Sequence, residues 1–260
     1  MQAIREDFRG GISPPLAVLT QGVGHVERQD GVRLILDKTT ENEYSNAQID
    51  DYLQRVSPHF TWQPPVRMTV RAWASHNADE LKGTAGFGFW AQPLMPGKSL
   101  PILPASVWFF FASSQTDMSF AQDIPGHGWK AATLDATRLP FLLLLPTAPL
   151  GFLLMRIPVL YRMLWPIAQR AIGVSEALVP VSLREPHTYR IDWLPRSIDF
   201  FIDDRLIHRT LFAPRGPLGF VAWLDNRYAI LTPQGRMGRG LLSMTERQWL
   251  ALENLKIDLL

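Results

Sequence analysis

Three residues are candidates for acid–base chemistry, and each lies in a short polar segment. Asp117, in Ser-Ser-Gln-Thr-Asp-Met, is a candidate general base. His127, in Pro-Gly-His-Gly-Trp, carries the side chain most often used for proton transfer near neutral pH. Tyr228 is a third candidate. The simpler interpretation is that Asp117 belongs to a turn and that His127 is merely exposed.

The segment Leu-Asp-Asn-Arg-Tyr gathers four polar side chains directly after an apolar, strand-like run. Asp225, Asn226 and Arg227 therefore form a candidate ligand-binding loop together with Tyr228. A polar turn capped by an Asp or Asn side chain has the same composition. Both interpretations stay open at this stage.

Several kinds of chemistry and partner are excluded or not indicated. The chain has no Cys, which excludes disulfides, thiolate metal sites and a Cys nucleophile. The six His show no metal-ligand spacing, so no metal or other cofactor is expected, although a structural Ca²⁺ would suit loop carboxylates. The net charge is +2 without a Lys/Arg run, which argues against nucleic-acid binding.

These polar segments must be held in place by β-strands, because apolar and polar residues alternate with a period of two in many short stretches that are separated by turns. Val66, Met68, Val70 and Ala72 alternate with polar residues, as in a half-buried strand. The run Gly-Thr-Ala-Gly-Phe-Gly-Phe-Trp-Ala predicts another strand, with glycines where a backbone or ligand approaches closely. About a dozen short strands predict one all-β sandwich domain over residues 1–260.

At residues 187–210, "HTYRIDWLPRSIDFFIDDRLIHRT", the chain resembles the concanavalin A-like jelly rolls, and most closely glycoside hydrolase family 16, the β-glucanases and laminarinases. The segments "GTAGFGFWAQP" and "ENLKIDLL" fit the same template. The resemblance implies a jelly-roll sandwich of two antiparallel sheets. The family's Asp-Gly hairpin is replaced by Asp203-Asp204, so a less tight turn is expected.

The resemblance also locates the strand that should carry catalysis. Active family members have Glu-x-Asp-x-x-Glu there, with a nucleophile and an acid/base about 5–5.5 Å apart. The corresponding segment here, "ASVWFFFASS", contains no acid, and Asp117 follows it alone. A standard retaining glucanase is therefore not expected, and no catalytic residue of the family is transferred to this chain.

In such jelly rolls the ligand lies in a cleft on one sheet. Aromatic side chains can stack on such a ligand, but they can equally pack in the core of the protein. Besides the residues already named, the aromatic residues expected to line the cleft are Trp108, Phe110, Trp129, Tyr189, Trp193 and Trp223.

Residues 139–172 break the strand pattern with an apolar, Pro-interrupted insertion that begins "LPFLLLLPTAPLGFLLM". From residue 136 to 175 its only charges are Arg138, Arg156, Arg162 and Arg170. A transmembrane helix, a buried lid and a surface helix dipping into lipid are the three interpretations. The side chains expected to form the lid or the lipid contact are Phe141, Leu144, Phe152, Leu153, Leu160 and Trp165.

The missing acids and the apolar insertion together favour a protein that binds an amphipathic or lipophilic small molecule near a membrane. Any chemistry would then be isomerisation, cyclisation or elimination, and whether the chain is an enzyme stays open. The alternative is a divergent glycosidase or carbohydrate-binding protein with relocated acids, such as Asp225 and Asp117. The polar N-terminus lacks a secretory pattern, so we expect the cytoplasm or the inner membrane surface.

Overall fold

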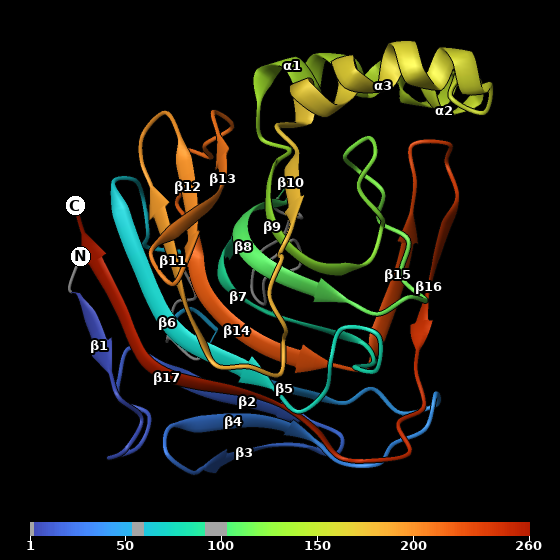
Figure 1. Cartoon of the computed structure of the whole chain (residues 1–260). Helices are drawn as coiled ribbons and strands as arrows, with labels where there is room; N and C mark the ends of the chain where they lie inside the picture. Colours follow the sequence, from blue (N-terminus) through green and yellow to red (C-terminus); the bar gives the residue numbers. More distant parts are fainter. Residues whose placement is uncertain (1–2, 54–59, 92–102) are drawn as a thin grey trace.

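The computed structural model describes residues 3–53, 60–91 and 103–260 and contains two facing antiparallel sheets (Figure 1). The first sheet follows the order β13 (Arg205–Thr210), β12 (Ile198–Ile202), β11 (His187–Trp193), β6 (Val66–Ala74), β17 (Gln248–Leu259), β4 (Val32–Leu36) and β3 (Gly24–Arg28). Strand β1 (Ile4–Glu6) also pairs with β17. We call this the eight-stranded sheet.

The second sheet has seven strands in the order β10 (Ser175–Leu178), β9 (Gly128–Asp135), β8 (Ala105–Ala112), β7 (Thr84–Ala91), β14 (Gly219–Asp225), β5 (Asn46–Asp50) and β2 (Ala17–Gln21). A separate hairpin pairs β15 (Arg227–Leu231) with β16 (Met237–Leu241). The predicted class, an all-β jelly-roll sandwich of two antiparallel sheets, is confirmed.

The interior between the sheets is built by alternation along each strand. On β6 the predicted apolar face, from Val66 to Ala72, is fully buried. On β8, Val107, Phe109 and Phe111 join the core, while the residues between them face away from the other sheet. Because successive side chains point to opposite faces, the position of Phe109 in the core also determines where its neighbours point.

An aromatic cluster holds the two sheets together. Phe109 and Phe87 contact Tyr189 with ring centroids 4.9 and 5.2 Å apart, and Trp129 lies 5.7 Å from Tyr189. The rings meet largely edge to face, an arrangement that stabilises aromatic pairs beyond the burial of their area. Since Tyr189 comes from β11 and the other three from the facing sheet, this cluster joins both layers.

The hairpin between β12 and β13 corrects an expectation from the sequence. Asp203 and Asp204 form a tight two-residue turn with φ values of 47° and 63°, although no Gly is present. Asp tolerates this left-handed region better than most residues. Bonds made by the side chains help hold the turn, because Asp203 accepts from the Thr188 N–H at 2.9 Å and Asp204 pairs with Arg190 at 2.5 Å. The prediction of a looser turn was wrong.

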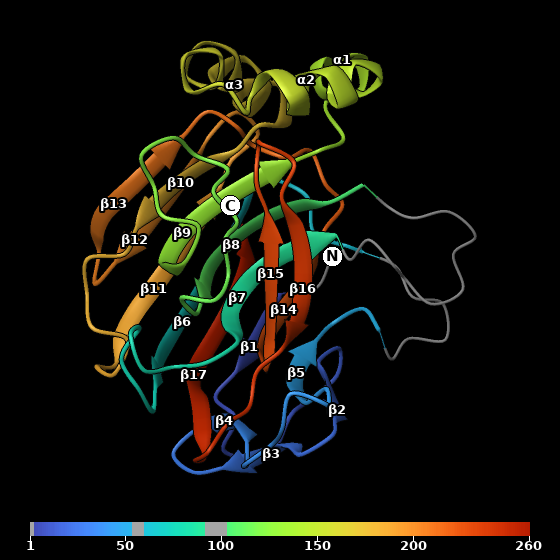
Figure 2. The same cartoon turned by 90° about the vertical axis from the view of Figure 1, so that its right-hand side faces the viewer.

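The insertion is helical, as predicted, and connects β9 to its antiparallel neighbour β10 at the sheet edge. It contains α1 (Leu139–Leu144), the 3-10 turn η1 (Leu145–Thr147), α2 (Ala148–Leu154) and α3 (Pro158–Ile172), which ends at Gly173 in the left-handed conformation. Figures 1 and 2 both show the helices as a layer at one end of the sandwich.

This layer is not a buried lid, because α1 and α2 contain no buried residue. Four of the six predicted contact residues line an apolar pocket of about 460 Å³ on the inner side of the helices: Phe141, Leu144, Phe152 and Trp165. Leu160 is half-buried, and only Leu153 is exposed. These four side chains face the pocket, and a lipid contact of the six residues stays a prediction.

In the part of the chain that the structure describes, no helix is long and apolar enough to cross a membrane. The transmembrane interpretation of the insertion is accordingly not supported. The location of the protein in the cell stays a prediction.

The aromatic cluster gives a direct stability test. Phe109→Ala removes a fully buried ring that contacts both sheets, and should lower the free energy of unfolding by about 3–5 kcal/mol. Urea denaturation followed by circular dichroism measures the loss. Phe201→Ala, on the half-buried outer side of β12, is the matched control, and an equal loss in both variants would contradict the assignment.

Candidate functional site

The outer face of the seven-stranded sheet carries a row of aromatic side chains, which we call the aromatic platform: Trp90, Trp108, Phe110 and Trp223. They come from β7, β8 and β14. Trp108 stacks against Trp90 and Phe110 with ring centroids 5.3 Å from each and interplanar angles of 21° and 19°. Trp223 lies 5.1 Å from Trp108. The four rings therefore form one continuous surface.

Glycines of β7 make room for this platform. Gly86 lies between Trp223 and Phe110 in the strand register, and a Cβ there would lie 2.8 Å from the Trp223 ring and 2.3 Å from the carbonyl oxygen of Phe109. With no side chain at this position, the indole of Trp223 can reach across β7 towards β8. The glycines predicted to permit close approach do so here.

The platform is partly accessible and has polar ends. Trp90 and Trp108 are half-buried, whereas Phe110 and Trp223 are each only 8% exposed. The indole Nε1 of Trp90 donates to the hydroxyl of Tyr52 at 3.2 Å. The accessible ring area thus belongs mainly to the two tryptophans on β7 and β8.

A buried carboxyl group lies at one end of the platform. Trp223 Nε1 donates to Thr84 Oγ1 at 3.0 Å, and that hydroxyl donates to Asp225 Oδ1 at 2.8 Å. The backbone N–H of Arg227 donates to the same oxygen at 3.1 Å. Burial raises the pKa of Asp225, and these two hydrogen bonds oppose the shift. Asp225 can therefore retain a proton at a higher pH than an ordinary aspartate.

Tyr44 extends this end of the site. Burial, and then the negative charge of Asp225, raise the pKa of the Tyr44 hydroxyl. The guanidinium of Arg227, exposed at the start of β15, lies 3.8 Å from the centre of the Tyr44 ring. Asp225 and Arg227, two residues of the predicted ligand-binding loop, thus belong to a polar cluster beside the aromatic platform.

The opposite end of the same face carries Glu176 on β10, paired with Lys130 on β9 at 3.2 Å. Both side chains are nearly inaccessible, and burial raises the pKa of Glu176 while Lys130 opposes the shift. Four inter-strand steps separate β10 from β14, and in the register Glu176 lies level with Val221, four residues from Asp225, so the two carboxyl groups are roughly 23 Å apart. Glycoside hydrolysis needs two carboxyl groups within about 10 Å, so these two cannot act as a pair.

Three residues predicted to line the cleft lie in the sandwich interior instead. Trp129 sits at an inward position of β9, and Tyr189 and Trp193 belong to β11 of the other sheet. Trp193 is fully buried and donates its Nε1 to the carbonyl oxygen of Pro214 at 2.9 Å. Their assignment to a ligand site was wrong, since aromatic content alone does not give the direction of a side chain.

Asn226 is also structural. It is fully buried, accepts from the Ser45 N–H at 2.9 Å and donates to the carbonyl oxygens of Glu43 and Leu242. Three segments are joined by this one amide. The predicted ligand contact is contradicted, and the polar turn is the correct interpretation for this residue.

The three predicted catalytic residues come from segments that the fold brings together. The Asp117 N–H donates to the carbonyl oxygen of Ala229, next to half-buried Tyr228, and Met118 N–H donates to Gly126, next to exposed His127. The Asp117 carboxylate accepts from Ser119 at 2.5 Å and from Arg236 at 3.2 Å. No hydrogen bond between the three side chains is found in the described residues, so a catalytic role stays a prediction.

Sequence reasoning missed Trp90, Thr84 and the Lys130–Glu176 pair. The alternation of "GTAGFGFWA" contained the signal for Trp90, since it places Trp90 on the same face as Gly86 and Gly88. Nothing in the sequence marks Thr84 or Glu176, because their partners come from distant strands.

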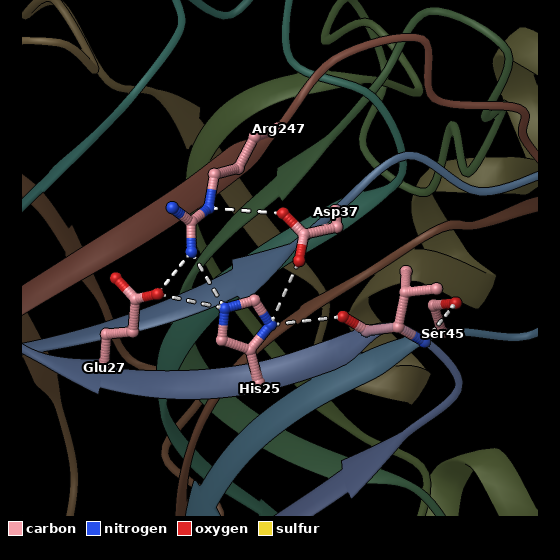
Figure 3. Close-up of polar contacts among 6 residues, drawn as sticks. His25, Glu27, Asp37, Ser45 and Arg247 are labelled. Carbon is pink, nitrogen blue, oxygen red and sulfur yellow. Dashed lines mark hydrogen bonds and ion pairs between the residues drawn. The ribbon is translucent and has the colours of Figure 1, made fainter.

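A further polar cluster lies around the β3–β4 hairpin (Figure 3). Arg247 lies 2.9 Å from His25 Nε2 and 3.3 Å from Asp37, and it also pairs with Glu27. These side chains are between a third and a half exposed, so the ion pairs contribute little stability. Within the described residues, no group of His, Asp and Glu could hold a metal ion. The cluster attaches the start of β17 to the hairpin.

No protein-family model matches the chain, and no curated protein matches it. Solved structures do share its fold. A lichenase, a β-1,3-1,4-glucanase from a mouse hindgut metagenome, has a TM-score of 0.55 at 10% identity and covers the whole of both chains. A glycoside hydrolase family 16 endo-glucanase from Bacteroides ovatus has a TM-score of 0.53 at 11% identity, over 98% of this chain and 99% of its own.

An endo-β-galactosidase from Clostridium perfringens has a TM-score of 0.53 at 12% identity, covering 98% of this chain but only 61% of its own. At these identities the similarity shows the fold, which is the concanavalin A-like jelly roll of the family 16 β-glucanases and laminarinases. The resemblance noted in the sequence is confirmed at that level.

These comparisons overturn one expectation. The fold neighbours act on carbohydrates according to their names, and they extend over nearly the full chain. The prediction of an amphipathic or lipophilic ligand as the main function is therefore corrected in favour of its carbohydrate alternative. The error arose because the apolar insertion was assumed to form a wall of the cleft.

The role of Gly86 can be tested by one methyl group. Gly86→Ala should displace Trp223 and cost about 1–3 kcal/mol of stability by overpacking. Near-ultraviolet circular dichroism reports the change in tryptophan packing. Gly238→Ala is the control, because its Cβ would meet no atom closer than 3.5 Å. Identical spectra for both variants would refute the close approach.

The environment of Asp225 predicts a pH dependence. A folded-state pKa above the unfolded one means that stability is lost as the pH rises from about 4 through the folded-state pKa. The Asp225→Asn variant has no carboxyl group to ionise at this position and avoids this loss. The free energy of unfolding of the variant minus that of the wild type should therefore increase as the pH rises from about 4 to the folded-state pKa, and should be constant above it. Urea titrations at several pH values measure it.

The control for the Asp225 experiment is Asp123→Asn, which removes one negative charge from an exposed position. A difference between Asp225→Asn and the wild type that does not change with pH would show that the carboxyl is not destabilised by burial.

Proposed function

We propose that the chain binds a carbohydrate chain across the aromatic platform. The observation that carries the proposal is the stacked surface of Trp90 and Trp108 on the outer face of the seven-stranded sheet. The apolar C–H faces of sugar rings pack well on aromatic faces, and nearby polar groups can orient the hydroxyls. The names of the fold neighbours support glucans or galactans as the class of ligand.

Binding is favoured over hydrolysis because the platform occupies the positions where carboxylates would be needed. The outward residues of β8 are Ser106, Trp108, Phe110 and Ala112, none of which is acidic. Residues 54–59 and 92–102, which lie outside the described part of the chain, contain no Asp or Glu in their sequence. They cannot supply the missing carboxylates.

Hydrolysis by relocated acids is the second candidate, and Asp225 is the observation that favours it. A buried carboxyl with a raised pKa next to a sugar platform has the character of a general acid. The reaction needs a second carboxylate at a suitable distance, and Glu176 lies too far away. Incubation with glucan and galactan oligosaccharides, followed by a reducing-end assay, tests this candidate directly. Product release abolished by Asp225→Asn would support it.

The binding proposal predicts a specific loss. Trp108→Ala should reduce the affinity for β-1,3- and β-1,4-linked gluco-oligosaccharides or for galacto-oligosaccharides at least about tenfold, equivalent to ~1.4 kcal/mol. Isothermal titration calorimetry measures it. Trp73→Ala is the control, since Trp73 is another half-buried tryptophan, paired with Trp249 on the outer face of the eight-stranded sheet.

Two results would count against the proposal. One is a wild-type protein that binds none of these oligosaccharides. The other is an equal effect of Trp108→Ala and Trp73→Ala, which would mean that the platform has no special role.

A further inference from the structure

Helix α3 has two apolar faces, and the protein uses only one of them. The inner face includes buried Trp165 and half-buried Leu164, which line the pocket described above. The outer face carries Val159 and Met163, four residues apart and 66% and 64% exposed, and Ile167, 59% exposed, lies at the border between the two faces because it also lines that pocket. A helix that is apolar all round is normally covered on both sides.

The other two helices extend this exposed apolar surface. In the described residues, 18 large hydrophobic side chains are exposed, and ten of them lie between residues 139 and 167. On α1 and α2 the most exposed are Leu139 and Leu143, at 66% and 69%, and Leu150 and Leu153, at 59% and 58%. Scattered single residues need no explanation, but a concentration of this kind marks an interaction surface.

The charge on the same helices has one sign. The segment from 136 to 175 contains no Asp or Glu, and its four charges are all Arg. Arg156, Arg162 and Arg170 are exposed, and the ion pairs found among the described residues include none of the four. Arg162 and Arg170 lie three residues after Val159 and Ile167, so they flank the outer apolar stripe.

We propose that the outer face of α1, α2 and α3 docks on the surface of an anionic lipid bilayer. The apolar side chains would enter the boundary between headgroups and acyl chains, and the arginines would pair with anionic headgroups. The helices lie as a layer at one end of the sandwich (Figure 1), so the face can meet a plane without obstruction by the sheets. This inference is independent of the carbohydrate site.

Charge argues against a second copy of the chain as the occupant. A two-fold interface through this face would bring the exposed Arg156, Arg162 and Arg170 of each copy together, with no acidic residue of the helices to compensate them. An anionic bilayer supplies the missing negative charge.

Vesicle co-sedimentation of the full chain tests the proposal. The protein should bind vesicles of phosphatidylcholine with phosphatidylserine. The triple variant Leu143→Glu, Val159→Glu, Met163→Glu, which changes only exposed positions, should lose at least about tenfold in partition coefficient. Leu259→Glu, at a residue 51% exposed on β17, is the matched control and should bind like the wild type. Circular dichroism verifies that all variants fold.

A second pair of measurements separates lipid binding from self-association. Arg156→Glu with Arg162→Glu should weaken binding to the phosphatidylserine vesicles and reduce the preference over phosphatidylcholine alone. The proposal is overturned if the wild type does not sediment with either vesicle, or if the triple variant sediments equally well. It is also overturned if light scattering shows a dimer that the triple variant abolishes while vesicle binding is absent.

Discussion

The packing of β8 on both of its faces is the constraint on which the rest of this structure depends. Its inward residues, such as Phe109, contact Tyr189 and join the two sheets. Its outward residues, Trp108 and Phe110, form the middle of the aromatic platform. Because a shift of one residue would exchange the two sets, the core contacts and the platform are determined by the same register.

The same constraint explains the chemistry of the outer face. Two outward positions of β8 carry the stacked rings of Trp108 and Phe110, and the other two, Ser106 and Ala112, are not acidic. The carboxyl groups of this face include Asp225 on β14 and Glu176 on the edge strand β10, where Thr84 and Lys130 provide hydrogen bonds, and Asp50 on β5, which accepts from the Tyr52 and Leu53 N–H groups. Burial raises the pKa of Asp225 and Glu176, but the strands between β10 and β14 keep these two carboxyl groups apart.

The position of the helical insertion does not depend on the register of β8. It leaves from β9 and returns to β10, so it is anchored at one edge of the sheet and extends from one end of the sandwich. Its inner residues pack on the 113–127 segment and on the β15–β16 hairpin, as the contact of Trp165 with Phe120 illustrates. Its outer residues, such as Val159 and Met163, are exposed in the described part of the chain, which distinguishes it from a lid.

The alternation of Val66 to Ala72, the turns and the His-Thr-Tyr segment were sufficient to predict the jelly roll, because these are local patterns of side-chain direction. The acid-free strand was equally visible in the sequence. Local patterns could not tell which sheet a strand joins, so Tyr189 and Trp193 were assigned to the wrong side. They also could not identify which stripe of α3 would be covered.

The sequence by itself therefore determined the class of fold, the lack of Asp and Glu in the strand at residues 105–112 and the helical character of the insertion. Only the tertiary structure decided the stacking of Trp90, Trp108 and Trp223, and the burial of Asp225 beside Thr84. The physical reason is that each of these contacts joins residues from different strands, and strand order and register are properties of the assembled sheets rather than of any single segment.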